Sequence, residues 1–81
     1  MRAKIYIRYK DGILDPQGTT VGHALNSMGY DAIDDVSVGK FIEINFTDIS
    51  KEEAKRLTDE SCRKLLSNPN TESYKFEIVE D

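Results

Sequence analysis

The chain has one cysteine and one histidine among its 81 residues, and it has no tryptophan. A single cysteine cannot form an internal disulfide, which fits a reducing compartment. One cysteine and one histidine also cannot supply the usual donor set of a tetrahedral zinc site. No aliphatic run exceeds two residues, so we expect neither a transmembrane helix nor a secretory signal segment. These absences predict a small soluble protein of the cytoplasm that does not engage a membrane.

Positive charge is scarce, with 11 Lys and Arg side chains against 15 Asp and Glu, and the net charge is -4. This balance argues against general binding to nucleic acid or to anionic membranes. The length predicts one domain over residues 1–81. A domain of this size buries only about 60% of the surface that its unfolded chain exposes. Because such a core leaves little spare stability, we expect association with another chain.

The first half of the sequence predicts a strand followed by a helix. Over residues 3–10, one face is apolar and the other is basic apart from Tyr6, the alternation of a half-buried strand. Asp15 can accept hydrogen bonds from the free amides of a first helical turn, and Pro16 needs no amide partner there. The Asp15 carboxylate also stands where an anion would bind, which argues against a phosphate site. The helix then carries one apolar stripe at i, i+3, i+4 and i+7, formed by Val21, Ala24, Leu25 and Met28.

The middle segment, residues 34–46, allows two interpretations. Its apolar residues at positions 36, 38, 42, 44 and 46 would share one face of a single extended strand. A two-residue hairpin at Gly39-Lys40 would move Ile42 and Ile44 to the opposite face, which is costly when one face is buried. We therefore predict one long strand bent near Gly39. A three-residue turn over residues 39–41, which would add a strand, is the alternative.

The remaining pattern completes an α+β fold. Ser50 and Glu53 form a capping-box pattern at the start of a second helix, and that helix must end before Pro69. Alternating apolar residues at 74, 76 and 78 predict a final strand. The order is β-α-β-α-β with a long bent central strand, or β-α-β-β-α-β with the extra turn. Helices on one face of a mainly antiparallel sheet would give a two-layer sandwich related to the ferredoxin-like arrangement.

No residue combination in the sequence indicates catalysis. His23 lies opposite the apolar stripe and has no neighbour to orient it as a general base. Cys62 falls in the interior of the second helix, where nothing lowers a thiol pKa, so we expect a buried or interfacial thiol. The acidic loop over residues 31–35 lacks the ligand spacing of a calcium site. We predict no catalytic, cofactor-binding or metal-binding residue on this chain.

Two surface features have a structural and a binding interpretation. The basic strand face with Lys4, Tyr6 and Arg8 lacks the paired aromatics of an RNA platform, so it is a solvated face or one that meets acidic groups of a partner. Gly18 and Gly22 each cost about 0.5–1 kcal/mol inside a helix. They indicate close approach of another backbone, from this chain or a partner, or else a weak helix that is tolerated.

Four short motifs, in this order, resemble the PurS family: LDPQG (14–18), MGY (28–30), VGK (38–40) and LLSNP (65–69). The likeness runs from about Ile5 to Ile78. Asn70 departs from the aliphatic residue expected after Asn-Pro, which affects local packing only. The resemblance implies the small subunit of phosphoribosylformylglycinamidine synthase, an ATP- and glutamine-dependent enzyme of purine biosynthesis.

The resemblance further implies a non-catalytic assembly subunit. It would bridge the ATP-dependent synthetase chain, PurL, and the glutaminase chain, PurQ, so that ammonia from glutamine converts formylglycinamide ribonucleotide into the amidine. ATP, magnesium and glutamine would serve the complex, with no cofactor on this chain. Self-association through the sheets, as a homodimer or a dimer of dimers, is also implied.

The candidate partner contacts combine unusual backbone requirements with expected exposure. They are Asp15, Pro16, Gln17, Gly18, Gly22, Gly39, Lys40, Phe41, Asn68 and Pro69. Lys40 is the preferred charged contact because it interrupts the apolar pattern at the bend, although a solvated lysine would look the same. The alternative function is a small-molecule-binding regulatory module of ferredoxin-like type, which would need a pocket with convergent polar groups.

Overall fold

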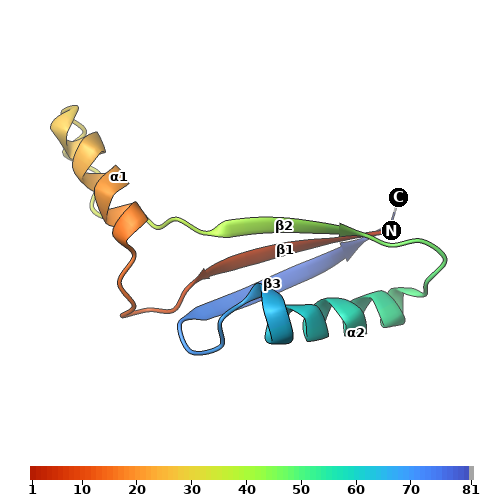
Figure 1. Ribbon diagram of the computed structural model, residues 1–81. Coiled ribbons are helices and arrows are strands. Elements are labelled where there is room, and N and C mark those ends of the chain that lie inside the picture. Colours follow the sequence, from red (N-terminus) through yellow and green to blue (C-terminus); the bar gives the residue numbers. More distant parts are fainter. Residues whose placement is uncertain (81) are drawn as a thin grey trace.

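The computed structural model describes residues 1–80 and has, within them, three strands and two helices (Figure 1). The elements in chain order are β1 (Arg2–Tyr9), α1 (Pro16–Ser27), β2 (Lys40–Asn45), α2 (Lys51–Ser61) and β3 (Glu72–Val79). A π-helical turn, η1 (Cys62–Leu66), continues α2. The predicted α+β class and β-α-β-α-β order are therefore confirmed. The last residue of the predicted 1–81 domain lies outside the described residues.

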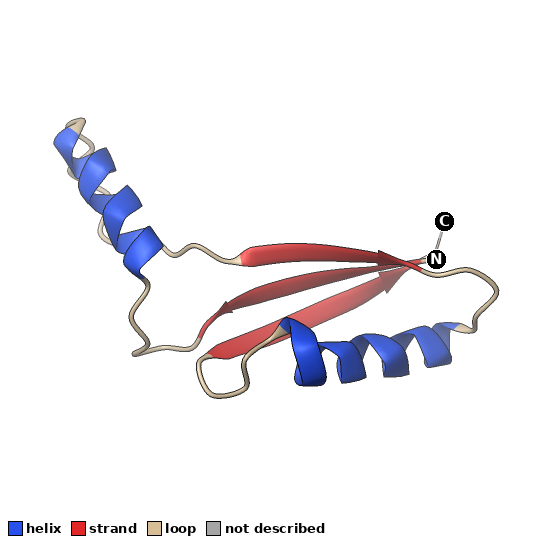
Figure 2. Ribbon diagram, in the orientation of Figure 1, coloured by secondary structure: helices blue, strands red, loops and turns tan. Residues whose placement is uncertain are grey.

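The three strands form one antiparallel sheet in the order β2-β1-β3. The register places Ile5 opposite Ile42 of β2 and Phe76 of β3, so apolar side chains share one face across all three strands. Helix α2 and η1 pack on this inner face against β1 and β3, and Ile5 and Cys62 are fully buried between the layers. The core therefore lies between a single helix and the sheet (Figure 2).

The outer face of the sheet is polar with one aromatic pair. Lys4 of β1 stands in register with Glu43 of β2 and Glu77 of β3. The rings of Tyr6 and Phe41 have centroids 5.2 Å apart. The basic face predicted for β1 is therefore flanked by acidic residues from the neighbouring strands of the same chain.

The central strand is shorter than predicted. Strand β2 has six residues, beginning at Lys40, and residues 36–39 run outside the sheet beside α1, as neither a bent strand nor a hairpin. The reason is that the backbone amide of Val38 donates a hydrogen bond to the Asp15 carboxylate, so this amide serves the start of α1 instead of a strand partner. The alternation of apolar residues over 36–46 spans two different environments.

The position of α1 corrects the predicted two-layer arrangement. Only α2 covers the sheet, whereas α1 projects away from one end of it (Figure 1). The molecule is elongated, with extents of 51 × 29 × 14 Å and a radius of gyration of 16.2 Å. A compact chain of this length would have a radius of gyration of about 12 Å. The apolar stripe of α1 consequently lacks a sheet to cover within the described part of the chain.

Candidate functional site

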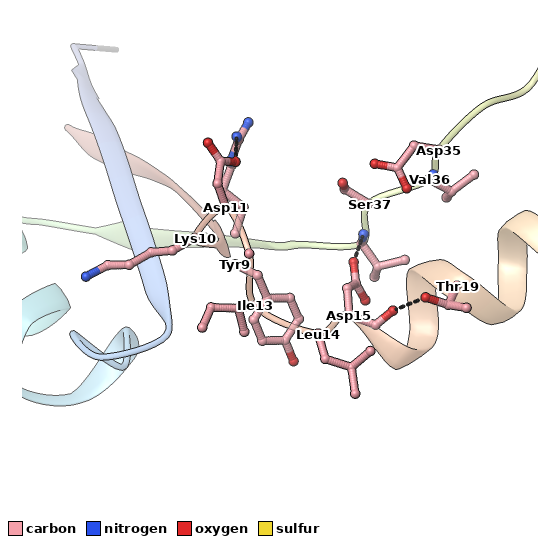
Figure 3. Close-up of a pocket in the computed structure, with 13 residues that line it drawn as sticks. Tyr9, Lys10, Asp11, Ile13, Leu14, Asp15, Thr19, Asp35, Val36 and Ser37 are labelled. Carbon is pink, nitrogen blue, oxygen red and sulfur yellow. Dashed lines mark hydrogen bonds and ion pairs between the residues drawn. The ribbon is translucent and has the colours of Figure 1, made fainter.

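Two loops join α1 to the sheet, residues 10–15 after β1 and residues 28–39 before β2. The first loop and the end of the second, residues 36–39, lie side by side (Figure 3). We call this pair of segments the elbow. Because the elbow contains or borders most of the predicted contact residues, we describe it as the candidate site.

Asp15 fastens the two segments of the elbow together. Its Oδ1 accepts a hydrogen bond from the amide of Gly18 at 2.8 Å, which caps α1 as predicted. Its Oδ2 accepts a hydrogen bond from the amide of Val38 at 2.9 Å. These two bonds, the Val38 bond foremost, hold the pKa of the Asp15 carboxyl below its ordinary value. Both carboxylate oxygens are thus engaged by the chain's own backbone.

Gly18 fits the first of the two interpretations left open by the sequence, close approach of another backbone, and that backbone belongs to this chain. A Cβ at Gly18 would lie 2.3 Å from the carbonyl oxygen of Val36, a position that only glycine can occupy without a shift. Gly22 is different, because a Cβ there would lie 3.7 Å from the Val36 side chain, at ordinary contact distance. Segment 36–38 therefore runs along α1 from Gly18 to Gly22.

Gly39 and Lys40 connect the elbow to the sheet. A Cβ at Gly39 would lie 2.5 Å from the carbonyl oxygen of Ile7, so glycine is required where the chain enters β2. The ammonium of Lys40 forms an ion pair with Glu72 at 3.6 Å. The other carboxylate oxygen of Glu72 accepts a hydrogen bond from the amide of Asn68 at 2.8 Å. Lys40, chosen as a partner contact, thus has an acidic neighbour in its own chain.

The loop after η1 reaches the same end of the sheet. The ammonium of Lys10 donates a hydrogen bond to the carbonyl oxygen of Pro69 at 2.6 Å. A hollow of about 240 Å³ lies nearby, where α1, β1 and β2 meet the start of β3, and its lining includes Gln17, Lys40 and Glu72. The structure therefore gathers the predicted segments 15–18, 39–40 and 68–69 at one end of the sheet. Phe41 lies apart from them, on the outer sheet face beside Tyr6.

A hollow of about 300 Å³ lies in the elbow itself (Figure 3). Its lining includes Asp15 and Thr19, and the Thr19 hydroxyl donates to the carbonyl oxygen of Asp15 at 2.9 Å. The polar groups nearest to α1 are therefore already paired with the backbone. The regulatory-module alternative would require polar groups that converge on a ligand, whereas the Asp15 carboxylate and the Thr19 hydroxyl are engaged by the chain's own backbone.

The residues considered for catalysis lie apart from one another. His23 is exposed on α1, whereas Cys62 is fully buried at the start of η1, facing the sheet. Burial first, and then the nearby Asp59 carboxylate, raise the pKa of the Cys62 thiol, which disfavours the reactive thiolate. Within residues 1–80, no group of three or more His, Cys, Asp or Glu side chains could hold a metal ion. No helix in that range has the length and apolarity needed to cross a membrane.

Sequence reasoning missed two residues that shape this end of the molecule. Glu72 has a side chain only 14% exposed, and it lies two residues before Tyr74 on the same face of β3. Extending the alternation of 74, 76 and 78 back by one step would have placed Glu72 inward. Nothing in the sequence indicated that Val36 would lie against α1, because its position also fits the apolar alternation of the predicted central strand.

The fold and the elbow define a small α+β interaction domain whose specialised residues set the direction of a projecting helix. The family model of PurS, described as phosphoribosylformylglycinamidine (FGAM) synthase, matches residues 2–80. The chain belongs to the PurS family.

Individual relatives agree with this assignment. The phosphoribosylformylglycinamidine synthase subunit PurS of Bacillus subtilis is 40% identical over 79 residues, which cover 98% of this chain and 93% of the relative. A crystal structure of PurS from Bacillus subtilis has a TM-score of 0.86 at 40% identity, with 98% of each chain covered. A chain of the PurLQS structure from Thermotoga maritima has a TM-score of 0.80 at 26% identity and covers 98% of this chain and 99% of its own length.

Proposed function

We propose that this chain is the non-catalytic assembly subunit of a phosphoribosylformylglycinamidine synthase. In this role it joins an ATP-dependent synthetase subunit, PurL, to a glutaminase subunit, PurQ, so that ammonia released from glutamine reaches formylglycinamide ribonucleotide. The observation that carries the proposal is the match to PurS over residues 2–80, together with the similarity to a chain of the PurLQS structure. The elbow supports it, since its polar groups fix shape and are not arranged around a substrate.

A separate bridging chain has a physical rationale. Ammonia that leaves the glutaminase is lost to water or protonated unless the mouths of the two active sites are held in line. Fixing their relative orientation gives the same advantage that positioning gives to intramolecular reactions. The close backbone approaches of Gly18 to Val36 and of Gly39 to Ile7 leave little free space at these points of the elbow, which suits a bridge that must hold a fixed shape.

The remaining parts of the proposal concern partners and location. ATP, magnesium and glutamine would be bound by the synthetase and glutaminase chains. The chain itself would form homodimers or dimers of dimers in the cytoplasm. The buried, unpaired thiol of Cys62 is compatible with a reducing compartment.

The docking role of the elbow can be tested by co-elution. Gln17 is exposed at the start of α1 and Thr47 is exposed at the opposite end of the sheet. We expect Gln17→Arg to weaken co-elution with the synthetase and glutaminase chains, because it places a large charge at the docking end. Thr47→Arg adds the same charge and should leave co-elution unchanged. Equal behaviour of the two variants would contradict the choice of the elbow as a contact surface.

A further inference from the structure

Glu72 is an acidic residue in a largely covered position at the start of β3. Its side chain is 14% exposed, and Glu72 stands opposite Tyr9 of β1 in the sheet register. A covered carboxylate costs free energy unless it is paired and hydrogen-bonded. Its Oε1 accepts a hydrogen bond from the amide of Asn68 at 2.8 Å, and its Oε2 lies 3.6 Å from the ammonium of Lys40. Glu72 therefore joins the loop after η1 to the start of β2.

Further hydrogen bonds fix the loop after η1 to the end of β1. The backbone amide of Lys10 donates to the carbonyl oxygen of Thr71 at 2.8 Å, and the ammonium of Lys10 donates to that of Pro69 at 2.6 Å. The backbone amide of Glu72 donates to the carbonyl oxygen of Asn68 at 2.7 Å. The Glu72 carboxylate is thus held by the backbone around it, and it in turn holds the Lys40 ammonium at this end of the sheet.

Lys40 is held by charge while its hydrogen-bond donors stay available. Its side chain is 57% exposed. The separation of 3.6 Å from Glu72 is longer than an ordinary N–H···O hydrogen bond of about 2.7–3.2 Å. An ammonium has three N–H donors, so Lys40 can donate to a second acceptor without leaving Glu72.

The hollow of about 240 Å³ beside Lys40 gives such an acceptor room to enter. Gln17 borders it from α1, where a larger side chain would fill the space. The elbow and the start of β3 meet here, so a partner that docks on this end covers the Lys40 ammonium. A covered ammonium needs a charged acceptor at hydrogen-bond distance, and Glu72 is too distant to be that acceptor.

We propose that this hollow receives an aspartate or glutamate side chain from a partner subunit of the synthase, with Lys40 as its donor and Glu72 as the residue that positions Lys40. A carboxylate supplies both the negative charge and the acceptor that a covered ammonium needs. Because the whole chain carries a net charge of -4, an acidic partner segment is favoured where a local cation meets it, which gives docking a preferred position. This inference rests on the proposed assembly function and specifies one of its contacts.

The affinity of the full chain for the assembled synthetase and glutaminase chains gives the first test. Lys40→Met removes the charge and should raise Kd about 30-fold or more, as expected when one member of a covered charge pair is lost. Lys40→Arg keeps the positive charge and should restore most of the affinity. Lys51→Met, the matched control, removes an exposed lysine at the start of α2, far from the elbow (Figure 1), and should leave Kd unchanged. Equal Kd values for Lys40→Met and Lys51→Met, with both folded by circular dichroism, would overturn the proposal.

Carbodiimide coupling of the wild type, followed by mass spectrometry, identifies the acceptor. The reagent forms an amide bond between Lys40 Nζ and the carbon of a carboxylate in contact with it, and it leaves as a urea after taking up the water released. In the chain alone, Lys40 should couple to Glu72, whose carboxylate is 3.6 Å away. In the complex, Lys40 should couple to an aspartate or glutamate of the synthetase or glutaminase chain. Coupling in the complex to Glu72 alone, or to a second copy of this chain, would overturn the proposal.

Inorganic phosphate separates a contact between subunits from a site for a small free anion. Phosphate should leave the Tm of the chain unchanged, whereas a rise in Tm that Lys40→Met abolishes would indicate a free-anion site and overturn the proposal. Glutamine-dependent turnover with the two other chains scores the assembly role separately. A Lys40→Met chain that binds and supports turnover like the wild type contradicts this contact alone, and a wild-type chain that binds neither subunit contradicts both ideas.

Discussion

The Asp15 side chain joins the start of α1 to the segment that precedes β2. Its carboxylate binds the amides of Gly18 and Val38 and so joins two segments 23 positions apart. The sequence predicted the first bond, because capping is a local pattern in which residue type and spacing are both visible. The second bond depends on where residues 36–39 pass, which is a tertiary outcome. The sequence therefore predicted that Asp15 caps α1, but it could not predict the hydrogen bond from Val38.

The Asp15 carboxylate should make the stability of the protein depend on pH. Because its pKa is lowered in the folded state, its contribution is complete above the unfolded pKa of about 4 and is lost as the pH falls through the folded value. Asp15→Asn should therefore be less stable than the wild type at neutral pH. The difference between the two should shrink as the pH falls below about 4. Urea unfolding over a pH series measures this, and a difference that stays constant would contradict the role of the charge.

The two glycines of α1 should respond in opposite ways to alanine. Gly18→Ala places a methyl group 2.3 Å from the Val36 carbonyl and should lower the free energy of unfolding by about 1–3 kcal/mol. Gly22→Ala meets only an ordinary contact at 3.7 Å and should raise that free energy by about 0.4–1 kcal/mol. Chemical denaturation of both variants gives the comparison. Similar effects at the two positions would show that the elbow is looser than described.

At the scale of elements, sequence patterns that act over a few neighbouring residues agree with the ends of the helices. Helix α2 begins after Ser50, whose hydroxyl accepts a hydrogen bond from the amide of Glu53 at 3.1 Å. Gly29, with φ +92°, ends α1 in the left-handed conformation that is typical of a C′ glycine, a local signal that the residue type itself carries. The length of β2 and the direction of α1 were predicted wrongly. Periodicity shows that a residue belongs to an apolar face, but it does not show which element, or which copy of the chain, covers that face.

The link between α2 and β3 allows a test at this scale. The Tyr74 hydroxyl donates to the Asp59 carboxylate at 2.6 Å and is the largest influence that lowers the pKa of Asp59, ahead of Arg63. Tyr74→Phe should therefore raise the pKa of Asp59 toward its ordinary value. The same change should reduce the stability of the packing between α2 and β3. NMR titration of the Asp59 carboxyl measures the shift, and an unchanged pKa would mean that Arg63 alone sets it.

At the scale of the whole molecule, an elongated outline and a charge-free projecting helix are features of a chain that completes itself in an assembly. The sequence indicated the need for partners through its small size and the lack of reactive groups around His23 and Cys62. It could not show that the candidate segments 15–18, 39–40 and 68–69 converge, because their convergence depends on the antiparallel order β2-β1-β3. Because these segments converge at one end, we propose that end as the docking surface.

The most direct measurement compares two nitrogen sources in the reconstituted enzyme. The synthetase and glutaminase chains are assayed for amidine formation with glutamine or with added ammonia, with and without this chain. We predict that the glutamine-dependent rate requires this chain, whereas the ammonia-dependent rate of the synthetase does not, because only the glutamine reaction depends on aligned active sites. A glutamine-dependent rate that is equally high without the chain would contradict its role as the bridge.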